Sequence, residues 1–441
     1  MKITHCRSCG GSRLQVVLNL GDHPVSNALL ARDEVDKPEE RFPLAIVFCR
    51  DCTLLQVTET VPAEVLYRAE YPYFSSSSPA LLRHAAEIAQ SLIEERKLGR
   101  NSFVVEVASN DGYLLRNFVE QGIPCLGIDP AKGPAEQANS IGVPTINKFF
   151  NSALAKKLAK KDGLLADVMI ANNVVAHVDA INDFVAGFAS MLKPTGVAVF
   201  ECAYAVDLVQ NCEFDTMYHE HLFYHTLHGL TPLFARHGLY LNDVKRLPIH
   251  GGSIRVFVSR DRKKTRALME LLRHEKALGV DQIGWYETFA DRVSSLKESL
   301  VALLRAEKAR GKRIACYGAA AKGSTMINYL NLGPGFFDFV VDANPHKQGQ
   351  FMPGQKIPIS HPDRLVADQP DLVLLLVWNF AGEVLRQQRA YREAGGRFLI
   401  PVPVPRIVEP SEVAGESPFA LAHLNAIVNA RPTVSGEPLS S

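Results

Sequence analysis

The stretch Phe103-Val-Val-Glu-Val-Ala-Ser-Asn-Asp-Gly-Tyr113 joins an apolar run to a polar turn. Such a run is typical of a buried strand, and a helix is predicted directly after the turn, over Tyr113–Gln121. Further apolar runs predict strands at Pro124–Ile128, Val168–Ala171 and Val197–Glu201, with helices between them. Strands that alternate with helices predict an open, mostly parallel α/β sheet that is covered on both faces.

The flanking segments extend this pattern in both directions. The apolar spacing of Pro79–Leu98 predicts an amphipathic helix before the first strand. Tyr240–Leu247 and Ser253–Ser259 have the character of a closing pair of strands after a long insertion. The charged stretch Arg262–Ala309 is predicted to be a long helical connector, and a second α/β unit begins with the strand Arg313–Tyr317.

Two Cys-x-x-Cys pairs near the N-terminus give the strongest local signal, Cys6-Arg-Ser-Cys9 and Cys49-Arg-Asp-Cys52. Each pair can present two thiolates to one metal ion, and two pairs complete a tetrahedral zinc site. The long gap between them requires a small subdomain of its own. A closed site of four cysteines has no open coordination position, so the expected zinc is structural; four ordinary buried thiols are the alternative.

The composition is that of an ordinary soluble protein. The chain has 441 residues, enough for two to four domains, with 47% hydrophobic and 22% charged residues and a formal net charge of +1. A balanced charge gives no general attraction to nucleic acid or anionic membranes. The N-terminus lacks an apolar signal core, and the other cysteines are scattered singly, which predicts a cytoplasmic protein.

The turn Ser109-Asn110-Asp111-Gly112 lies at the carboxyl end of the first predicted strand, where open α/β sheets bind ligands. Asp129 ends the second strand and can accept hydrogen bonds from two ribose hydroxyls. The turn lacks the Gly-x-Gly-x-x-Gly pattern of dinucleotide-binding folds. A single glycine with polar neighbours suits a smaller, cationic cofactor, and S-adenosylmethionine fits that description. The alternative is an ordinary turn in which a serine or asparagine caps the next helix.

The run Tyr218-His-Glu-His-Leu-Phe-Tyr-His-Thr-Leu-His228 contains four histidines. His221, His225 and His228 could share one helical face and bind a metal ion. However, the order differs from His-Glu-x-x-His, so the usual two-ligand geometry is missing. The aromatic neighbours favour a partly dry pocket for an organic substrate.

Several motifs in this order resemble those of the bacterial sugar C-methyltransferases that act on nucleotide-linked 4-keto sugars. They are the two cysteine pairs, Glu106–Leu115, Asn172-Asn-Val-Val-Ala-His-Val178, Tyr218-His-Glu-His221 and His250-Gly-Gly-Ser-Ile-Arg255. The resemblance covers nearly the whole chain, and it implies a class I (Rossmann-like) methyltransferase domain between a small N-terminal four-cysteine zinc-binding domain and a C-terminal Rossmann-like α/β domain. The expected boundaries are residues 1–62 for the zinc-binding domain, 63–260 for the methyltransferase domain, 261–410 for the C-terminal domain and 411–441 for a tail.

The resemblance also implies, position by position, which residues hold S-adenosylmethionine. They are Glu106, Ser109, Asn110, Gly112, Tyr113, Asp129 and Asn172. One departure is Ala108, where a more usual methyltransferase turn has glycine. A methyl group at this position narrows the turn without excluding the cofactor.

The implied methylation at carbon requires a base, because the carbon beside a ketone must lose a proton to become nucleophilic. Histidine titrates near neutrality, so we expect His221 to be the base, with Glu220 or a second histidine as helper. Adjacent residues rarely face each other on a helix, so the segment is expected to be a loop unless Glu220 has a separate role. Tyr218 and His177 are candidates to donate hydrogen bonds to the enolate oxygen.

Three more residues are candidates for contact with the substrate. Tyr73 and Ser76 belong to a stretch rich in tyrosine and serine, whose rings and hydroxyls suit a sugar and a base, although it could be a plain turn. Lys322 lies in the turn that opens a predicted helix of the second α/β unit and could meet a diphosphate. The alternative for that unit is a nucleotide fold retained only for packing.

The expected substrate is therefore a dTDP- or GDP-linked 4-keto-6-deoxy sugar, methylated beside the ketone at C-3. A rival interpretation is an NAD(P)-dependent sugar-nucleotide oxidoreductase that uses Asp342 and the turn at residues 318–324, although that turn lacks the third glycine. A zinc-containing nucleic-acid binder conflicts with the neutral charge. We expect no nucleic-acid or membrane partner, and a monomer or weak dimer.

Overall fold

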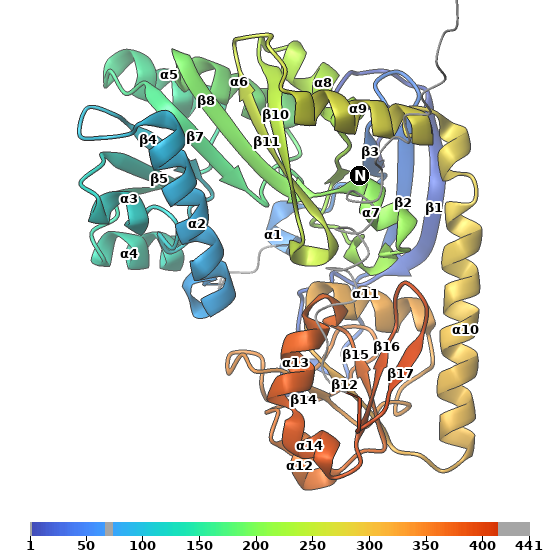
Figure 1. The fold of residues 1–441 in the computed structure, drawn as a ribbon. Helices are drawn as coiled ribbons and strands as arrows, with labels where there is room; N and C mark the ends of the chain where they lie inside the picture. The colour runs from blue at the N-terminus through green and yellow to red at the C-terminus, as the bar shows by residue number, and fades with distance from the viewer. Residues whose placement is uncertain (1, 67–73, 413–441) are drawn as a thin grey trace, which may run out of the picture.

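The computed structural model describes residues 2–66 and 74–412. Its described part is built on three sheets, shown in Figure 1 with the central sheet at the upper left, the zinc-domain sheet at the upper right and the third sheet below. The long helix α10 (Phe289–Ala309) runs along the right-hand edge beside both the zinc-domain sheet and the third sheet.

The central sheet has seven strands in the order β10-β11-β8-β7-β4-β5-β6. All neighbours are parallel except β11, which is antiparallel to both β8 and β10. This is the strand order of a class I methyltransferase, so the predicted fold class is confirmed. The strands are β4 (Val104–Val107), β5 (Cys125–Asp129), β6 (Thr145–Asn147), β7 (Ala166–Asn172), β8 (Leu192–Ala203), β10 (Tyr240–Leu247) and β11 (Ser253–Ser259).

Helices cover both faces of the central sheet because its strands are apolar on both sides. Val104 points into a core with α2, α3 and α4, whereas Val105 points into a core with α5, α6 and α8. The helix predicted over Tyr113–Gln121 begins at Arg116, because residues 113–115 form turns, with i→i−3 hydrogen bonds such as that from Phe118 to Leu115. The helices are α2 (Pro79–Arg96), α3 (Arg116–Glu120), α4 (Lys132–Ser140), α5 (Ser152–Lys161), α6 (Ile181–Met191) and α8 (Leu227–Ala235).

The zinc-domain sheet is completed by a strand from the methyltransferase domain. Strands β1 (Leu14–His23), β2 (Phe42–Cys49) and β3 (Leu55–Val57) are antiparallel, and β3 pairs with β9 (Phe223–Tyr224). Since β9 lies within the histidine-rich run 218–228, the pairing of Gln56 with Phe223 ties that run to the zinc domain.

The connector consists of two helices, α9 (Arg266–Leu278) and α10, instead of one. Gly279 ends α9 in a left-handed conformation, with φ at 80°, which glycine adopts without steric cost. The third sheet has the order β14-β13-β12-β15-β16-β17 and is parallel apart from β17. Its elements are β12 (Ile314–Tyr317), α11 (Ala321–Leu330), β13 (Val340–Val341), β14 (Ile359–Ser360), α12 (Arg364–Asp368), β15 (Leu372–Leu375), α13 (Ala381–Gln387), α14 (Arg389–Glu393), β16 (Arg397–Ile400) and β17 (Arg406–Val408).

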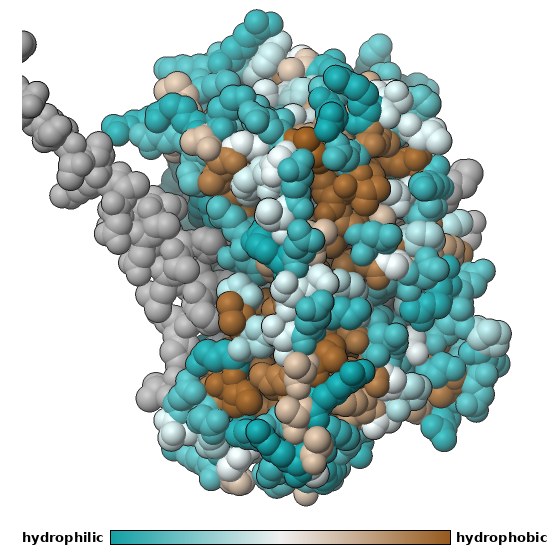
Figure 2. Space-filling view, turned by 90° about the vertical axis from the view of Figure 1, so that its right-hand side faces the viewer, coloured by the Kyte–Doolittle hydropathy of each residue, from teal (hydrophilic) through white to brown (hydrophobic). Residues whose placement is uncertain are grey.

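The surface that carries β1 and α10 is mixed in character. Figure 2 shows apolar areas in its upper and lower halves, separated and bordered by hydrophilic side chains. On β1 and α9 the most exposed large apolar side chains are Val16 and Met269. None of the helices in the described residues has the length and apolar character needed to span a membrane. The expected monomer or weak dimer stays a prediction.

Candidate active site and zinc site

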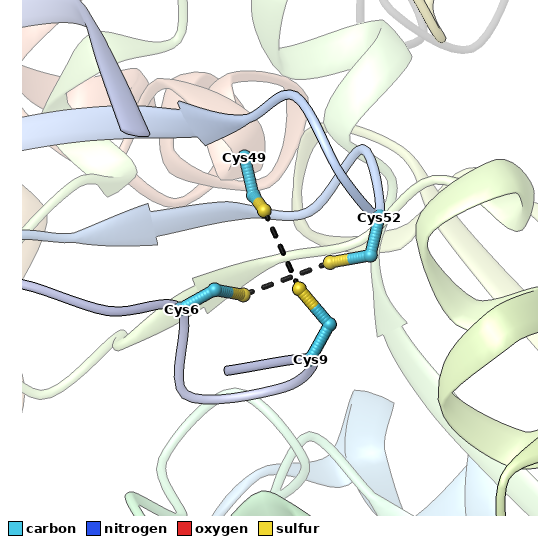
Figure 3. A group of neighbouring side chains, drawn as sticks. All are labelled: Cys6, Cys9, Cys49 and Cys52. Carbon is cyan, nitrogen blue, oxygen red and sulfur yellow. Dashed lines mark hydrogen bonds between the residues drawn. The ribbon is translucent and has the colours of Figure 1, made fainter. Parts of the chain in front are cut away.

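The four cysteines of the N-terminal motif point toward one another (Figure 3). Cys6 Sγ lies 3.6 Å from Cys52 Sγ, and Cys9 Sγ lies 3.6 Å from Cys49 Sγ. Sulfur atoms about 2.3 Å from a tetrahedral zinc ion lie roughly 3.8 Å apart, so the four thiols fit zinc. Within residues 2–66 and 74–412, these four form the group of side chains close enough to share a metal ion.

Backbone turns and nearby donors hold the thiols in place. Both cysteine pairs end in a left-handed residue, Gly10 with φ at 75° and Thr53 with φ at 62°, which closes each turn by a backbone hydrogen bond to the first cysteine. The side-chain amide of Gln56 donates to Cys6 Sγ at 3.1 Å, and the backbone N–H of Gly11 donates to Cys9 Sγ at 3.4 Å. Such donors orient metal ligands and stabilise thiolate charge.

The turn after β4 has an unusual backbone that opens the end of the sheet. Ala108, Asn110 and Gly112 all have positive φ angles, at 56°, 49° and 78°. Glycine adopts a left-handed backbone conformation without steric cost, whereas in alanine this conformation raises the free energy by roughly 1 kcal/mol or more. The sequence departure at Ala108 therefore falls on a position whose backbone favours glycine. A side chain at Gly112 would also meet Val143 at 3.1 Å.

Asp129, at the end of β5, fastens this turn. Its carboxylate accepts hydrogen bonds from the backbone N–H of Asn110 and of Ala131, each at 2.8 Å. Each carboxylate oxygen has a second acceptor site, so these contacts leave capacity for ribose hydroxyls. Burial raises the pKa of Asp129, which the two backbone donors partly oppose.

Several buried oxygen atoms around this turn have no hydrogen-bond partner among the described residues. They are Glu106 Oε2, Ser109 Oγ, Asp111 Oδ1 and Asn172 Oδ1. Burial raises the pKa of Glu106 well above its ordinary value, and the neighbouring carboxylates Asp129 and Asp111 raise it further. A buried acceptor without a hydrogen-bond donor lowers the stability of the fold. A ligand that brings hydrogen-bond donors and positive charge would satisfy these acceptors. S-adenosylmethionine, with its sulfonium and ammonium groups, meets that requirement.

The segment before α2 lies against the same turn. Asn110 Oδ1 accepts the backbone N–H of Ser75 at 2.8 Å, and Asp111 Oδ2 accepts that of Ser76 at 3.1 Å. The structure thus brings Ser76 to the cofactor crevice through its backbone. Tyr73, the other predicted substrate contact of this stretch, lies outside the described residues. Tyr113 is half-buried beside the turn.

The histidine motif forms a loop, as expected, and its geometry defines one reactive pair. His221 Nδ1 donates to the carbonyl of Thr216 at 2.9 Å, which leaves Nε2 to accept the hydroxyl of Tyr218 at 2.7 Å. Burial lowers the pKa of His221 well below its ordinary value, and the nearby His177, Lys322 and His250 lower it further. The ring is therefore neutral at pH 7, with its Nε2 lone pair directed at the phenol.

The loop after β7 connects this pair with the cofactor crevice. Asn172 ends β7 at the crevice, and the ring of His177 lies 4.8 Å from that of His221, centre to centre. A backbone hydrogen bond of 2.7 Å from Leu222 to Ala176 joins the two loops. The loop that follows Asn172 thus contacts the histidine loop through Ala176 and His177.

Glu220 has a different setting from the one expected of a helper that orients His221. Its Oε1 accepts a hydrogen bond of 2.7 Å from the side chain of Asn27, whereas the His221 ring is oriented by Thr216. Burial raises the pKa of Glu220 to about 7, and the bond from Asn27 partly opposes that change. The sequence left open whether Glu220 orients His221 or has a role of its own. Its bond to Asn27 and the bond of His221 to Thr216 favour a role of its own.

The other histidines of the motif point elsewhere. His225 is fully buried with its ring stacked on Phe223, and His228 Nδ1 donates to Glu275 at 2.6 Å. The run therefore does not present one helical face, because only residues from Leu227 onward are helical.

The C-terminal domain contributes Lys322, from the first turn of α11. Lys322 Nζ donates to the side-chain oxygen of Asn379 at 2.7 Å and lies 4.5 Å from the centre of the Trp378 ring. Trp378 in turn donates to Asp215 at 2.7 Å, and burial raises the pKa of Asp215 to about 6. The charge of Lys322 also contributes to the low pKa of His221, so this lysine is within electrostatic reach of the histidine loop.

Comparisons with known proteins match all three parts of the chain. Residues 6–67 match the family described as "Putative zinc binding domain", residues 81–244 a "Methyltransferase domain", and residues 248–403 a "C-methyltransferase C-terminal domain". The chain is 34% identical to the C-methyltransferase NovU of Streptomyces niveus, over 92% of this chain and 97% of that relative. The chain belongs to the C-methyltransferase family.

Solved structures of other methyltransferases align with part of the chain. Magnesium protoporphyrin IX methyltransferase from Synechocystis PCC 6803, with bound S-adenosylmethionine, aligns with 41% of this chain and 79% of its own, at 11% identity and a TM-score of 0.32. The YcgJ protein of Bacillus subtilis aligns with 41% of this chain and 99% of its own, at 15% identity and a TM-score of 0.33.

This C-methyltransferase uses S-adenosylmethionine as its methyl donor, and the residues present fit both that cofactor and zinc. Four further residues near the site received no role from the sequence, although His250 belongs to a motif that was noted: Asn27, His84, Glu201 and His250. Buried Glu201, at the end of β8, accepts from Arg255 at 2.8 Å and from His84 at 2.8 Å. His250 has a left-handed backbone, with φ at 57°. The motif His250–Arg255 was the available signal, because two adjacent glycines follow the histidine.

The second α/β unit gives no support for a nicotinamide cofactor. Asp342 already accepts the backbone N–H groups of Ala319, at 2.7 Å, and of Asn344, at 2.8 Å. Lys347 lies 3.7 Å from the same carboxylate and donates to the carbonyl of Ala319 at 2.8 Å.

Proposed function

We propose that this C-methyltransferase methylates the carbon beside the ketone of a dTDP- or GDP-linked 4-keto-6-deoxy sugar, at C-3, through an enolate. The observation that carries the proposal is the neutral His221, whose Nε2 faces Tyr218 next to the loop that leads from Asn172. NovU, a C-methyltransferase of similar length, supports transfer to carbon.

His221 acts as the base in this mechanism. Its Nδ1–H is held by the Thr216 carbonyl, so a proton removed from the sugar carbon arrives at Nε2, directly or through the Tyr218 hydroxyl. Tyr218 is then our candidate donor to the enolate oxygen, whereas the ring of His177, the other predicted donor, already bonds to the backbone of Glu220. S-adenosylmethionine, when bound by the residues around Glu106 and Asp129, supplies the methyl group.

Lys322 is our candidate for the substrate diphosphate. It is a cation at the first turn of a ten-residue helix, and it stands close to the histidine loop. Helix N-termini and lysine both favour phosphate groups. Lys322→Met should raise KM for the nucleotide sugar at least tenfold while changing kcat less.

The proposal is tested by incubating the protein with S-adenosylmethionine and a panel of dTDP- and GDP-linked 4-keto-6-deoxy sugars. One member should gain a methyl group at carbon, seen by mass and by NMR. His221→Asn should lower kcat roughly 10²–10⁴-fold, the usual worth of a positioned base.

A second measurement isolates the proton-removal step. In heavy water, with S-adenosylhomocysteine in place of the donor, wild-type protein should exchange the proton beside the ketone and His221→Asn should not. Full turnover by His221→Asn would exclude His221 as the base. Methylation at oxygen, or of no sugar in the panel, would contradict the proposed substrate class.

A further inference from the structure

We propose that Asn27, which belongs to the zinc domain, is a positioning residue for the carboxylate of Glu220 in the active site. The inference rests on the proposed function, since it assumes that Glu220 serves the methylation site. Its basis is the 2.7 Å hydrogen bond from Asn27 Nδ2 to Glu220 Oε1, between two loops that are remote in sequence. With Oε1 engaged, Oε2 is the oxygen that can meet the substrate.

The loop that carries Asn27 is fixed by the C-terminal domain. Ser26 Oγ lies 3.2 Å from Thr325 Oγ1 of α11, and both side chains are buried. Leu30 exchanges two backbone hydrogen bonds with Phe351, at 3.0 Å and 2.9 Å. The loop is thus held on both sides of residue 27, which restricts the positions from which the Asn27 amide can reach the carboxylate.

Glu220 needs such a donor because its surroundings disfavour a charge. It is only 5% exposed. Three titratable groups flank it: His177, whose ring bonds to the Glu220 backbone, and the sequence neighbours His219 and His221. Burial lowers the pKa of all three histidines, so each is neutral at pH 7. The Asn27 amide is therefore the polar group that favours ionised Glu220.

The position of the zinc sheet strengthens this link. Strand β3 pairs with β9 immediately after the loop, and the backbone N–H of Val57 donates to the Leu222 carbonyl at 2.9 Å. The zinc domain therefore makes two contacts with this segment. Its sheet pairs with the residues after Glu220, and its Asn27 binds the Glu220 carboxylate. Asn27 itself is exposed, so its replacement should leave the fold intact.

The test compares Asn27→Ala with Asn27→Gln and with the control Ser26→Ala. Two quantities are measured: the pH dependence of kcat on the methylated sugar, and the titration of Glu220 in ¹³C-glutamate-labelled protein, assigned by difference from Glu220→Gln. Asn27→Ala should raise the pKa of Glu220, and the acid limb of kcat, by about one unit, the usual effect of one hydrogen bond to a charged group. KM for S-adenosylmethionine should stay constant.

The variants separate positioning from general loosening of the loop. Asn27→Gln retains an amide donor and should recover part of the wild-type titration. Ser26→Ala removes the contact with Thr325 but keeps the Leu30–Phe351 hydrogen bonds and the Asn27 donor, so it should shift the titration less than Asn27→Ala does. The proposal is wrong if Asn27→Ala titrates like wild type, or if Ser26→Ala shifts the titration as far as Asn27→Ala does. Because the ¹³C titration needs no turnover, protein that methylates no sugar would contradict the proposed function while the link between Asn27 and Glu220 is still decided.

Discussion

Glu106 shows how a single buried side chain opposes stability while serving the cofactor. It is 1% exposed, and Oε2 has no hydrogen-bond partner within the described part of the chain. The carboxylates of Asp129 and Asp111 face it as well, so its charged form is disfavoured by burial and by like charge. Such a group is tolerated at a binding site because the ligand supplies the missing positive charge.

We predict that Glu106→Gln stabilises the cofactor-free protein at neutral pH and weakens S-adenosylmethionine binding roughly 10–100-fold. A carboxyl whose pKa is raised by folding stabilises the protein most below its unfolded pKa, and this contribution is lost as pH rises through the folded value. The wild-type melting temperature should therefore fall more steeply above about pH 4.5 than that of Glu106→Gln. Calorimetry with S-adenosylhomocysteine and melting curves at several pH values measure both effects. Tighter cofactor binding by Glu106→Gln would contradict the assignment.

At the scale of elements, the start of α8 is locked to the connector helix α9. Glu275 is fully buried and accepts hydrogen bonds from the Tyr204 hydroxyl at 2.9 Å and from the backbone N–H groups of Leu227 and His228 at 2.8 and 3.0 Å. A carboxylate at a helix N-terminus satisfies donors that the helix itself leaves free. Because α8 follows the histidine loop and β9, this contact also fixes the end of the active-site segment.

We expect Glu275→Gln to destabilise the protein by about 2 kcal/mol, since a buried amide replaces a carboxylate that accepts several hydrogen bonds. The matched control is Glu270→Gln on the same helix, where the carboxylate forms an exposed ion pair with Arg266. That change should have no measurable effect on the free energy of unfolding, because exposed pairs contribute little. If urea unfolding shows the same loss of unfolding free energy for both variants, Glu275 does not stabilise the contact between α8 and α9.

At the scale of the whole molecule, the zinc domain packs against both the methyltransferase domain and the C-terminal domain. Its sheet shares one apolar core with α10 and the third sheet, through residues such as Ile46 and Leu300. Its cysteines border a second core with the methyltransferase domain, through residues such as Leu54 and Phe223. Loss of order in this domain should therefore disturb both interfaces and the strand β9.

We predict one equivalent of zinc per chain and strong coupling between zinc and the fold. Metal binding by thiolates contributes directly to folding free energy. Cys9→Ser, or removal of zinc by a strong chelator, should lower the melting temperature and solubility and weaken the protection of β3 and β9 in hydrogen exchange. Activity should fall together with the fold. Activity lost to a chelator with unchanged melting and exchange would instead indicate a catalytic metal.

The sequence by itself determined the four-cysteine group and the α/β series, because these depend on local spacing and periodicity. It also predicted the active-site loop from the histidine motif. The pairs Cys6/Cys9 and Cys49/Cys52, the strands at either side of residues 103–129 and the histidine motif are all short-range patterns. The division of the connector into α9 and α10 also has a local cause in the sequence, because Gly279 ends α9.

Only the tertiary structure decided which groups meet in space. The Asn27–Glu220 hydrogen bond, the pairing of β3 with β9 and the approach of Lys322 to the histidine loop join segments from all three parts of the chain. No periodicity encodes such contacts, since they arise when domains pack their cores together. The same packing sets the charge states, because burial lowers the pKa of His221 and raises that of Glu220. Desolvation is a property of the folded molecule. Two adjacent residues acquire opposite pKa shifts because burial disfavours the charged form of each, the carboxylate of Glu220 and the imidazolium of His221.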